Sequence, residues 1–139
     1  MQTVQLHKLS EGQVGELLGL MRELDPEIEV TGEMLQEAAD RAQMYAILDG
    51  EHIIATGTLL VSASPTGRKA HIEDVVVSQA YRGRHLGRKL LEHLLEEARK
   101  YAPISVHLTS RPSRESANML YRSLGFVKRD TNVYKLELK

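Results

Sequence analysis

The sequence predicts one α/β domain over residues 1–139, in which a single mixed sheet carries helices on both faces. Three observations lead to this fold class. The length of 139 residues is enough for one hydrophobic core and too short for two. Apolar side chains alternate in some segments, as in strands, and recur at helical intervals in others. Taken in order, these segments interleave strands with helices, which is typical of a mixed sheet covered on both sides.

The chain is expected to begin with a strand and two helices. Residues 3–9 alternate apolar and polar side chains, which predicts a half-buried strand. Ser10 starts a capping-box pattern, and apolar residues then recur at helical spacing until Pro26 stops the helix. Thr31 is the expected cap of a second helix over residues 33–42.

A hairpin and a further strand follow. Residues 43–48 and 53–61 have strand composition, and Asp49-Gly50 between them is a strong hairpin signal. Residues 69–77 return as another strand.

The second half of the chain alternates helices and strands. Apolar residues from Leu86 onward form one stripe of a long amphipathic helix, which ends before Pro103. Gly125 is placed to close a shorter helix as a left-handed cap. The remaining expected elements are a strand over 104–109, that shorter helix over 114–124, and a final strand or hairpin over 126–129 and 132–138.

Composition excludes several classes of function. The net charge of −1 argues against broad nucleic-acid binding, which needs a strongly basic domain. The absence of cysteine excludes disulfides, thiolate metal sites and a cysteine nucleophile, and the histidines lack ligand spacing, so no metal is predicted. Without a long apolar run or a signal peptide, we expect no membrane association and a cytoplasmic location.

Residues 72–91 carry the strongest functional signal. A strand passes through a glycine-containing turn into a helix, and only basic charged residues occur between Arg82 and Lys89. Gly83 and Gly87 allow a ligand to approach the backbone, and the first turn of a helix leaves N–H groups without partners. These features together predict a site for a phosphate-bearing ligand at a strand–loop–helix junction.

This turn resembles the acyl-CoA signature of the GNAT family of N-acetyltransferases, often written Gln/Arg-x-x-Gly-x-Gly/Ala. Arg82 matches the first position and Gly87 the last. His85 stands where the middle glycine is usual, so it must keep a negative φ or adopt the uncommon left-handed conformation. Asn118, Tyr121 and the Gly-Phe pair that follows are similar to a second family motif, Asn-x-x-Tyr-x-x-x-Gly-Phe. The resemblance covers residues 46–134.

The resemblance implies a fold, a cosubstrate and its binding residues. GNAT domains have a mostly antiparallel mixed sheet of roughly six to seven strands flanked by about four helices. Acetyl-CoA is the cosubstrate, with its pantetheine arm along the strand before the turn and its diphosphate on the turn itself. The residues that the resemblance assigns to coenzyme binding are Val75, Val76, Val77, Arg82, Gly83, Arg84, His85, Leu86, Gly87, Arg88, Asn118 and Tyr121.

The resemblance also implies catalytic roles. Tyr121 matches the general acid that protonates the leaving thiolate. Glu73 is the first choice for the base that deprotonates the amine, and His71 is the second. Strand alternation would place both on one face with Val75 and Val77, and would turn Asp74 to the other. Because there is no cysteine, acetyl transfer is expected by direct attack in a ternary complex.

The acceptor and the oligomeric state stay open at this point. The pattern around the turn is also similar to glucosamine-phosphate N-acetyltransferases, so an amino sugar phosphate stands beside small amines and protein amines as the primary-amine acceptor. The alternative function is a non-catalytic acyl-CoA or nucleotide sensor. Relatives often dimerise through their C-terminal strands, and the alternating residues 131–139 suit such pairing, so a homodimer is one option.

Overall fold

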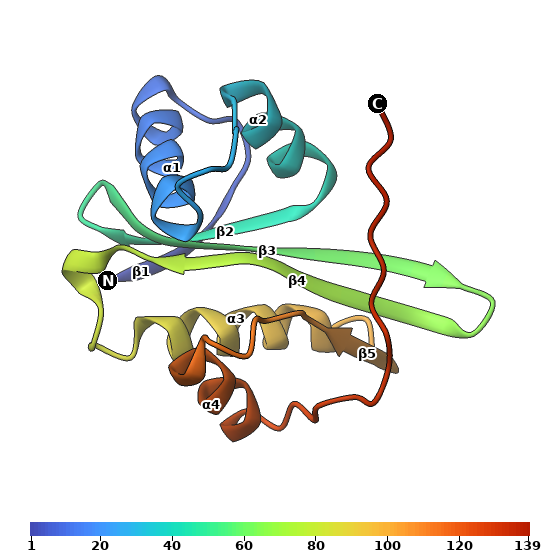
Figure 1. Ribbon diagram of the computed structural model, residues 1–139. Helices are drawn as coiled ribbons and strands as arrows, with labels where there is room; N and C mark the ends of the chain where they lie inside the picture. The colour runs from blue at the N-terminus through green and yellow to red at the C-terminus, as the bar shows by residue number, and fades with distance from the viewer. The chain divides into compact units, whose positions relative to one another are not determined.

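The computed structural model describes every residue from 1 to 139, in two compact units, Met1–Thr109 and Ser110–Lys139. The first unit holds the sheet and three α-helices, and the second holds one α-helix followed by an extended segment (Figure 1). The single domain expected over residues 1–139 stays a prediction. The elements are β1 (Gln2–Leu6), α1 (Glu11–Leu24), α2 (Gly32–Arg41), β2 (Gln43–Asp49), β3 (His52–Ser64), β4 (Gly67–Val77), the 3-10 turn η1 (Gln79–Tyr81), α3 (Leu86–Arg99), β5 (Ile104–His107) and α4 (Glu115–Ser123).

The sheet is mixed and mostly antiparallel. Its strands lie in the order β1-β2-β3-β4-β5, so they are neighbours in sequence as well as in space. The first four pair antiparallel, and β5 pairs parallel to β4. The predicted fold class is confirmed, with five strands in place of the larger number expected.

Helices cover both faces of the sheet in the first unit. Figure 1 shows α1 and α2 on one face and α3 on the other. A Cβ added at Gly57 of β3 would lie 3.2 Å from Leu94 and 3.3 Å from Leu90, so the glycine lets α3 pack close to the strand. The core beneath α1 and α2 contains Leu17, Leu20, Leu35, Met44, Ala46 and Val76.

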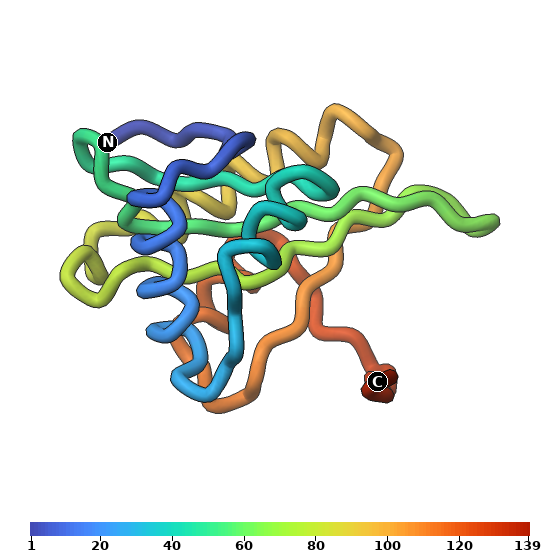
Figure 2. The backbone as a smooth tube through the Cα atoms, turned by 90° about the horizontal axis from the view of Figure 1, so that it is seen from above, coloured from blue at the N-terminus to red at the C-terminus, as the bar shows by residue number.

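The local signals at the helix and hairpin ends are confirmed. Ser10 accepts a hydrogen bond from the Gln13 backbone N–H while the Gln13 side chain bonds back, which completes the capping box of α1. Thr31 caps α2 through the backbone N–H of Met34. Gly50 adopts φ of 61° in the β2–β3 turn. The tip of the β3–β4 hairpin extends past α1 and α2 (Figure 2). None of the helices combines the length and the apolar composition that a membrane span requires.

The second unit differs from the prediction after its helix. Gly125 has φ of 99°, and the Phe126 N–H donates to the Tyr121 carbonyl at 3.1 Å, so the predicted left-handed cap is confirmed. The predicted strands over 126–129 and 132–138 are wrong as elements of this sheet, because neither pairs with another strand. Alternating composition gives a segment strand propensity, but a strand also needs a neighbouring edge for its backbone hydrogen bonds.

Candidate active site

A β-bulge interrupts β4 where the sequence predicted regular alternation. Thr58 of β3 pairs with Glu73. Two residues earlier on β3, Thr56 pairs with Val76, which lies three residues further along β4, so β4 holds one extra residue. Asp74 lies in this bulge with φ of 53°, in the left-handed region that non-glycine residues seldom adopt. The extra residue reverses the side-chain alternation of the rest of β4.

The bulge changes which side chains share a face. Glu73 and Val76 both pair with threonines of the same β3 face, and Val76 belongs to the core beneath α1 and α2. Val75 instead contacts the α3 side of the sheet. The predicted grouping of His71 and Glu73 with Val75 and Val77 is therefore wrong, because the bulge lies between the two pairs. His71 and Glu73 precede the bulge and do share a face.

The same part of β4 leaves one backbone edge without a partner strand. β5 pairs with Arg68 through His71 only. From Ile72 to Val77, β4 has no strand on its β5 side. An extended ligand can add itself to such an edge through main-chain hydrogen bonds. Val75, Val76 and Val77, which the resemblance assigned to the pantetheine arm, lie on this edge.

The turn after β4 supplies backbone N–H groups at a helix start. Gly83 has φ of 82° and His85 has φ of 60°, so His85 takes the left-handed alternative that the sequence left open. His85 is the N-cap of α3 but makes no side-chain cap hydrogen bond, and the first turn has no acidic residue. The N–H groups of this turn are therefore suited to an anion. The residues assigned to the diphosphate all lie here: Arg82, Gly83, Arg84, His85, Leu86, Gly87 and Arg88.

The backbone conformation of His85 leads to a stability prediction. A non-glycine residue in the left-handed region destabilises the fold by about 1–2 kcal/mol. Glycine avoids this steric cost, but it loses more conformational entropy on folding, so only part of the cost is recovered. We expect His85→Gly to raise the free energy of unfolding by about 0.5–1 kcal/mol, measured by urea denaturation. His85→Ala is the matched control and should leave it nearly unchanged, since alanine keeps the strained conformation. A loss of stability in His85→Gly would contradict the prediction.

The surroundings of Glu73 raise the pKa of its carboxyl. Although Glu73 keeps part of its surface open to solvent, desolvation by neighbouring protein raises the pKa of its carboxyl. The nearby charge of Asp74 raises this pKa further, and His71 opposes the shift. Desolvation also raises the pKa of Asp74. A carboxylate with a raised pKa is a better proton acceptor for an ammonium group than an ordinary one.

His71 lies beside β5, the strand at one edge of the sheet. It pairs in register with His107 of β5, and the two rings stack with centroids 5.4 Å apart and planes at 25°. The Ser105 hydroxyl lies 3.0 Å from Nε2 of His107. The stacking therefore fixes the orientation of the His71 ring, and His71 lies two residues before Glu73 on β4.

The two candidates on α4 are each fixed within the second unit. The side-chain amide of Asn118 donates to the carbonyls of Arg111 and Arg114, at 2.9 Å in each case. Asn118 thereby holds the turn that precedes α4, in addition to its predicted coenzyme contact. The ring of Tyr121 packs edge-on against Phe126, with centroids 6.1 Å apart. This contact restricts the direction of the phenol.

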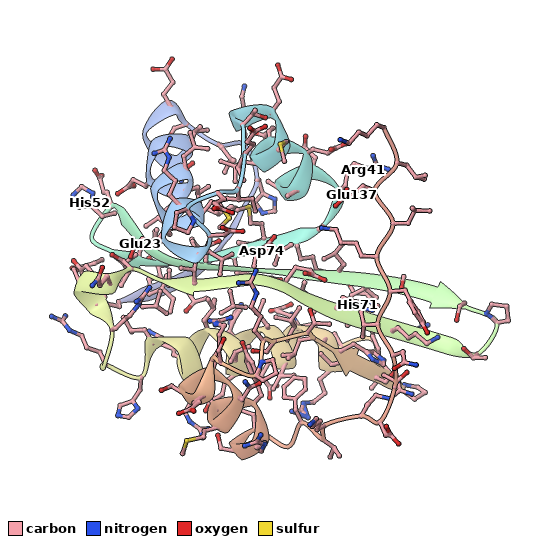
Figure 3. All side chains as sticks on the ribbon, viewed as in Figure 1. Glu23, Arg41, His52, His71, Asp74 and Glu137 are labelled. Carbon is pink, nitrogen blue, oxygen red and sulfur yellow. The ribbon has the colours of Figure 1, made fainter.

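Sequence reasoning missed the residues that hold the turn from outside it. Glu23, at the end of α1, lies near the turn (Figure 3) and accepts a hydrogen bond from the Gln79 backbone N–H at 2.7 Å. Asp49 accepts one from the Tyr81 hydroxyl at 2.6 Å. These pairs are far apart in sequence, so no local pattern indicates them. The only residue in the sequence that could have indicated such a contact is Tyr81, which directly precedes the signature and carries a hydroxyl that can donate a hydrogen bond.

Comparisons with known proteins show which family the chain is similar to. The model of the Acetyltransferase (GNAT) family matches residues 13–126. Glucosamine 6-phosphate N-acetyltransferase 1 of Oryza sativa is 30% identical over 84% of this chain and 76% of its own length. A ribosomal-protein-alanine N-acetyltransferase of Escherichia coli is 40% identical over 42% of this chain and 39% of its own. The crystal structure of a Trypanosoma brucei acetyltransferase superposes with a TM-score of 0.78 at 26% identity, covering 99% of each chain.

Proposed function

The chain belongs to the GNAT acetyltransferase family of acyl-CoA-dependent enzymes, and on that premise we propose that it transfers the acetyl group of acetyl-CoA directly to a primary amine. The reaction takes place in a ternary complex, since the chain has no cysteine to carry the acetyl group. One observation carries the proposal: the unpaired edge of β4 runs directly into a turn and helix start suited to an anion.

Two adjoining parts of the chain suit the two parts of the coenzyme. The edge at Val75–Val77 offers main-chain groups to the amide-containing pantetheine arm, as a sheet edge does to an added strand. The first turn of α3 and the residues before it offer N–H groups and positive charge to the diphosphate. The order along the chain, edge and then turn, matches the order of arm and diphosphate in the coenzyme.

On the acceptor side, Glu73 is the proposed base. At neutral pH the substrate amine is an ammonium group, which cannot attack a thioester until it loses a proton. Glu73 accepts that proton, and the freed nitrogen forms a bond to the thioester carbon. A backbone N–H of the β4 edge stabilises the carbonyl oxygen as negative charge develops on it. His71 is the second candidate for the base, and its position two residues away keeps it beside the same substrate.

On the leaving-group side, Tyr121 is the proposed acid. When the carbon–sulfur bond breaks, the phenol gives its proton to the coenzyme sulfur, and the second proton that the acylated nitrogen releases restores the phenol. Asn118 keeps its proposed contact with the pantetheine arm. The edge-on packing of Tyr121 against Phe126 supports the role, because it limits the directions in which the hydroxyl can point.

For the acceptor, we propose an amino sugar phosphate as the first class to test. The relative from Oryza sativa, which matches 84% of this chain, is named for glucosamine 6-phosphate. The partial match to a ribosomal-protein-alanine N-acetyltransferase keeps protein N-termini as the competing class.

The test measures release of coenzyme thiol from acetyl-CoA with each acceptor class in parallel. The panel contains glucosamine 6-phosphate, glucosamine, a polyamine and a peptide with N-terminal alanine. The proposal expects turnover that depends on both substrates and is highest with glucosamine 6-phosphate. Turnover only with the peptide would overturn the acceptor class, and acetyl-CoA binding with no turnover on any amine would favour the sensor alternative.

We further propose that two copies of the chain pair through their C-terminal segments. Apolar side chains alternate along this segment and are almost fully exposed, with Tyr134 at 87%, Leu136 at 81% and Leu138 at 86%. Lys135 and Glu137 form an ion pair at 2.7 Å, which places the polar side chains together on the opposite side. β5 is the last strand of the sheet. In the proposed dimer, the C-terminal segment of each copy pairs with the free edge of β5 in the other copy.

A charge on the apolar side of this segment should separate the copies. We expect a dimer by light scattering after size exclusion, and a monomer for Leu136→Glu, since burying each large apolar side chain contributes about 1.5–3 kcal/mol. Lys135→Gln, on the polar side, is the control and should stay dimeric. A wild-type chain that is monomeric at micromolar concentration would contradict the prediction.

A further inference from the structure

The turn that joins β4 to α3 has few hydrogen bonds of its own. Within it, the Tyr81 N–H donates to the Ser78 carbonyl at 2.9 Å, and the Arg82 N–H donates to the Gln79 carbonyl at 3.3 Å. Neither Ser78 nor His85 caps the following helix with its side chain. The geometry of the turn therefore depends on bonds from other elements.

Two carboxylates from regular elements provide those bonds. Glu23, in the last turn of α1, accepts the Gln79 N–H at 2.7 Å. Asp49, the last residue of β2, accepts the Tyr81 hydroxyl at 2.6 Å. The hydrogen bond to Asp49 raises the pKa of the Tyr81 phenol, so Tyr81 stays a donor at neutral pH. The turn is thus held at both ends of its 3-10 segment.

Arg82 is already engaged by the protein itself. Its Nε donates to the Val77 carbonyl at 3.1 Å, and its Nη2 lies 3.9 Å from Oε1 of Glu23. These contacts fold the guanidinium back toward the end of β4. Arg82 therefore braces the turn, and its position in the signature is explained without a direct phosphate contact.

Arg84 is held in a different way. Its Cζ lies 5.1 Å from the centroid of the Tyr81 ring, and it forms no salt bridge. Arg88, by contrast, pairs with Glu92 at 3.1 Å. A guanidinium over an aromatic face keeps its full positive charge available to an anionic ligand, because the ring orients the guanidinium without neutralising its charge. The ring itself is fixed through the hydroxyl bond to Asp49.

We propose that Asp49 and Tyr81 are positioning residues for acetyl-CoA, which hold the Arg84 guanidinium where it binds a phosphate group of the coenzyme. This inference rests on the proposed function and adds to it a specific path: Asp49 fixes Tyr81, and Tyr81 orients Arg84. It also separates the two signature arginines, with Arg82 bracing the turn and Arg84 contacting the ligand.

A double-mutant cycle tests this path. Tyr81→Leu removes the ring and the hydroxyl, and should raise the KM for acetyl-CoA roughly five- to tenfold while kcat changes by less than about twofold. In the Arg84→Ala background the same substitution should change KM by less than about twofold, since there is no guanidinium left to orient. Both single variants should also weaken the salt dependence of KM, because each loses a charge contact. Arg99→Ala, an exposed arginine paired with Glu96, is the control for charge alone.

The conservative variants keep the test decisive if Tyr81→Leu folds poorly. Tyr81→Phe and Asp49→Ala both break the bond between these residues, and each should raise KM roughly two- to threefold, whereas Asp49→Asn keeps an acceptor and should stay near the wild-type value. Equal effects of a Tyr81 substitution in both backgrounds, or an unchanged KM in Arg84→Ala, would overturn the proposal. Calorimetric titration of the wild type with acetyl-CoA distinguishes a failure of the positioning role from a failure of the proposed function. Normal binding with an additive cycle refutes only the positioning role, and no binding refutes the proposed function itself.

Discussion

Replacing Glu73 with glutamine should lower kcat/KM for the amine at neutral pH by about 10²–10³-fold, because the variant has no group at this position to accept the ammonium proton. Glutamine keeps the size and hydrogen-bonding capacity of the side chain, so acetyl-CoA binding should change little. The measurement is thiol release under steady-state conditions, together with calorimetric titration of acetyl-CoA.

The pH profile tests the same assignment more specifically. A base works in its deprotonated form, so wild-type kcat/KM should be low in acid and rise with pH through the pKa of Glu73. Because desolvation and then the Asp74 charge raise this pKa, the rise should lie above the ordinary carboxyl value of 4.5. Asp74→Asn removes one of these causes and should move the rise to lower pH. Glu73→Gln should lose it altogether.

Glu96 provides the control for these experiments. It is an exposed glutamate on α3 that pairs with Arg99, and Glu96→Gln should leave both kcat/KM and the pH profile unchanged. A Glu73→Gln enzyme with near-normal activity and an unchanged acid limb would show that another group, with His71 first in line, accepts the proton.

Tyr121→Phe should reduce kcat by about 10²–10³-fold while the affinity for acetyl-CoA stays within about twofold. The phenylalanine ring preserves the edge-on packing against Phe126, so the variant removes only the proton donor. Steady-state kinetics give kcat, and titration with acetyl-CoA gives the affinity separately. A large loss of affinity would indicate a binding role for the hydroxyl instead.

The exposed Tyr134 serves as the matched control for this substitution. Tyr134 is 87% exposed in the single chain, and phenylalanine keeps the apolar ring that the proposed dimer would bury, so Tyr134→Phe should have the kinetics of the wild type. An unchanged kcat in Tyr121→Phe would mean that the thiolate leaves without help from this residue, and Tyr121 would then be only a packing residue of α4.

The features that the sequence predicted well are those set by neighbouring residues. The capping box at Ser10, the cap at Thr31 and the left-handed Gly125 depend on contacts within a few positions, so their patterns are visible in the chain. The start of α3 belongs to the same class, because a first helical turn without an acidic residue or a side-chain cap is a local property.

The features that it missed depend on pairing between distant segments. The bulge at Asp74 arises from the register of β4 against β3, and a period-2 pattern on one strand cannot reveal it. The bonds from Glu23 and Asp49 to the turn join elements far apart in sequence. The segment after Phe126 has the composition of a strand, but its pairing depends on an available edge that its own residues do not specify.

The most direct test of the account is residue-specific NMR of the backbone amides during titration with acetyl-CoA. We predict shifts and slowed hydrogen exchange at Val75–Val77 and across Gly83–Gly87, since these N–H groups gain hydrogen bonds to the pantetheine arm and the diphosphate. Saturable binding whose shifts lie elsewhere, for example in α2 or β1, or the absence of binding, would contradict it.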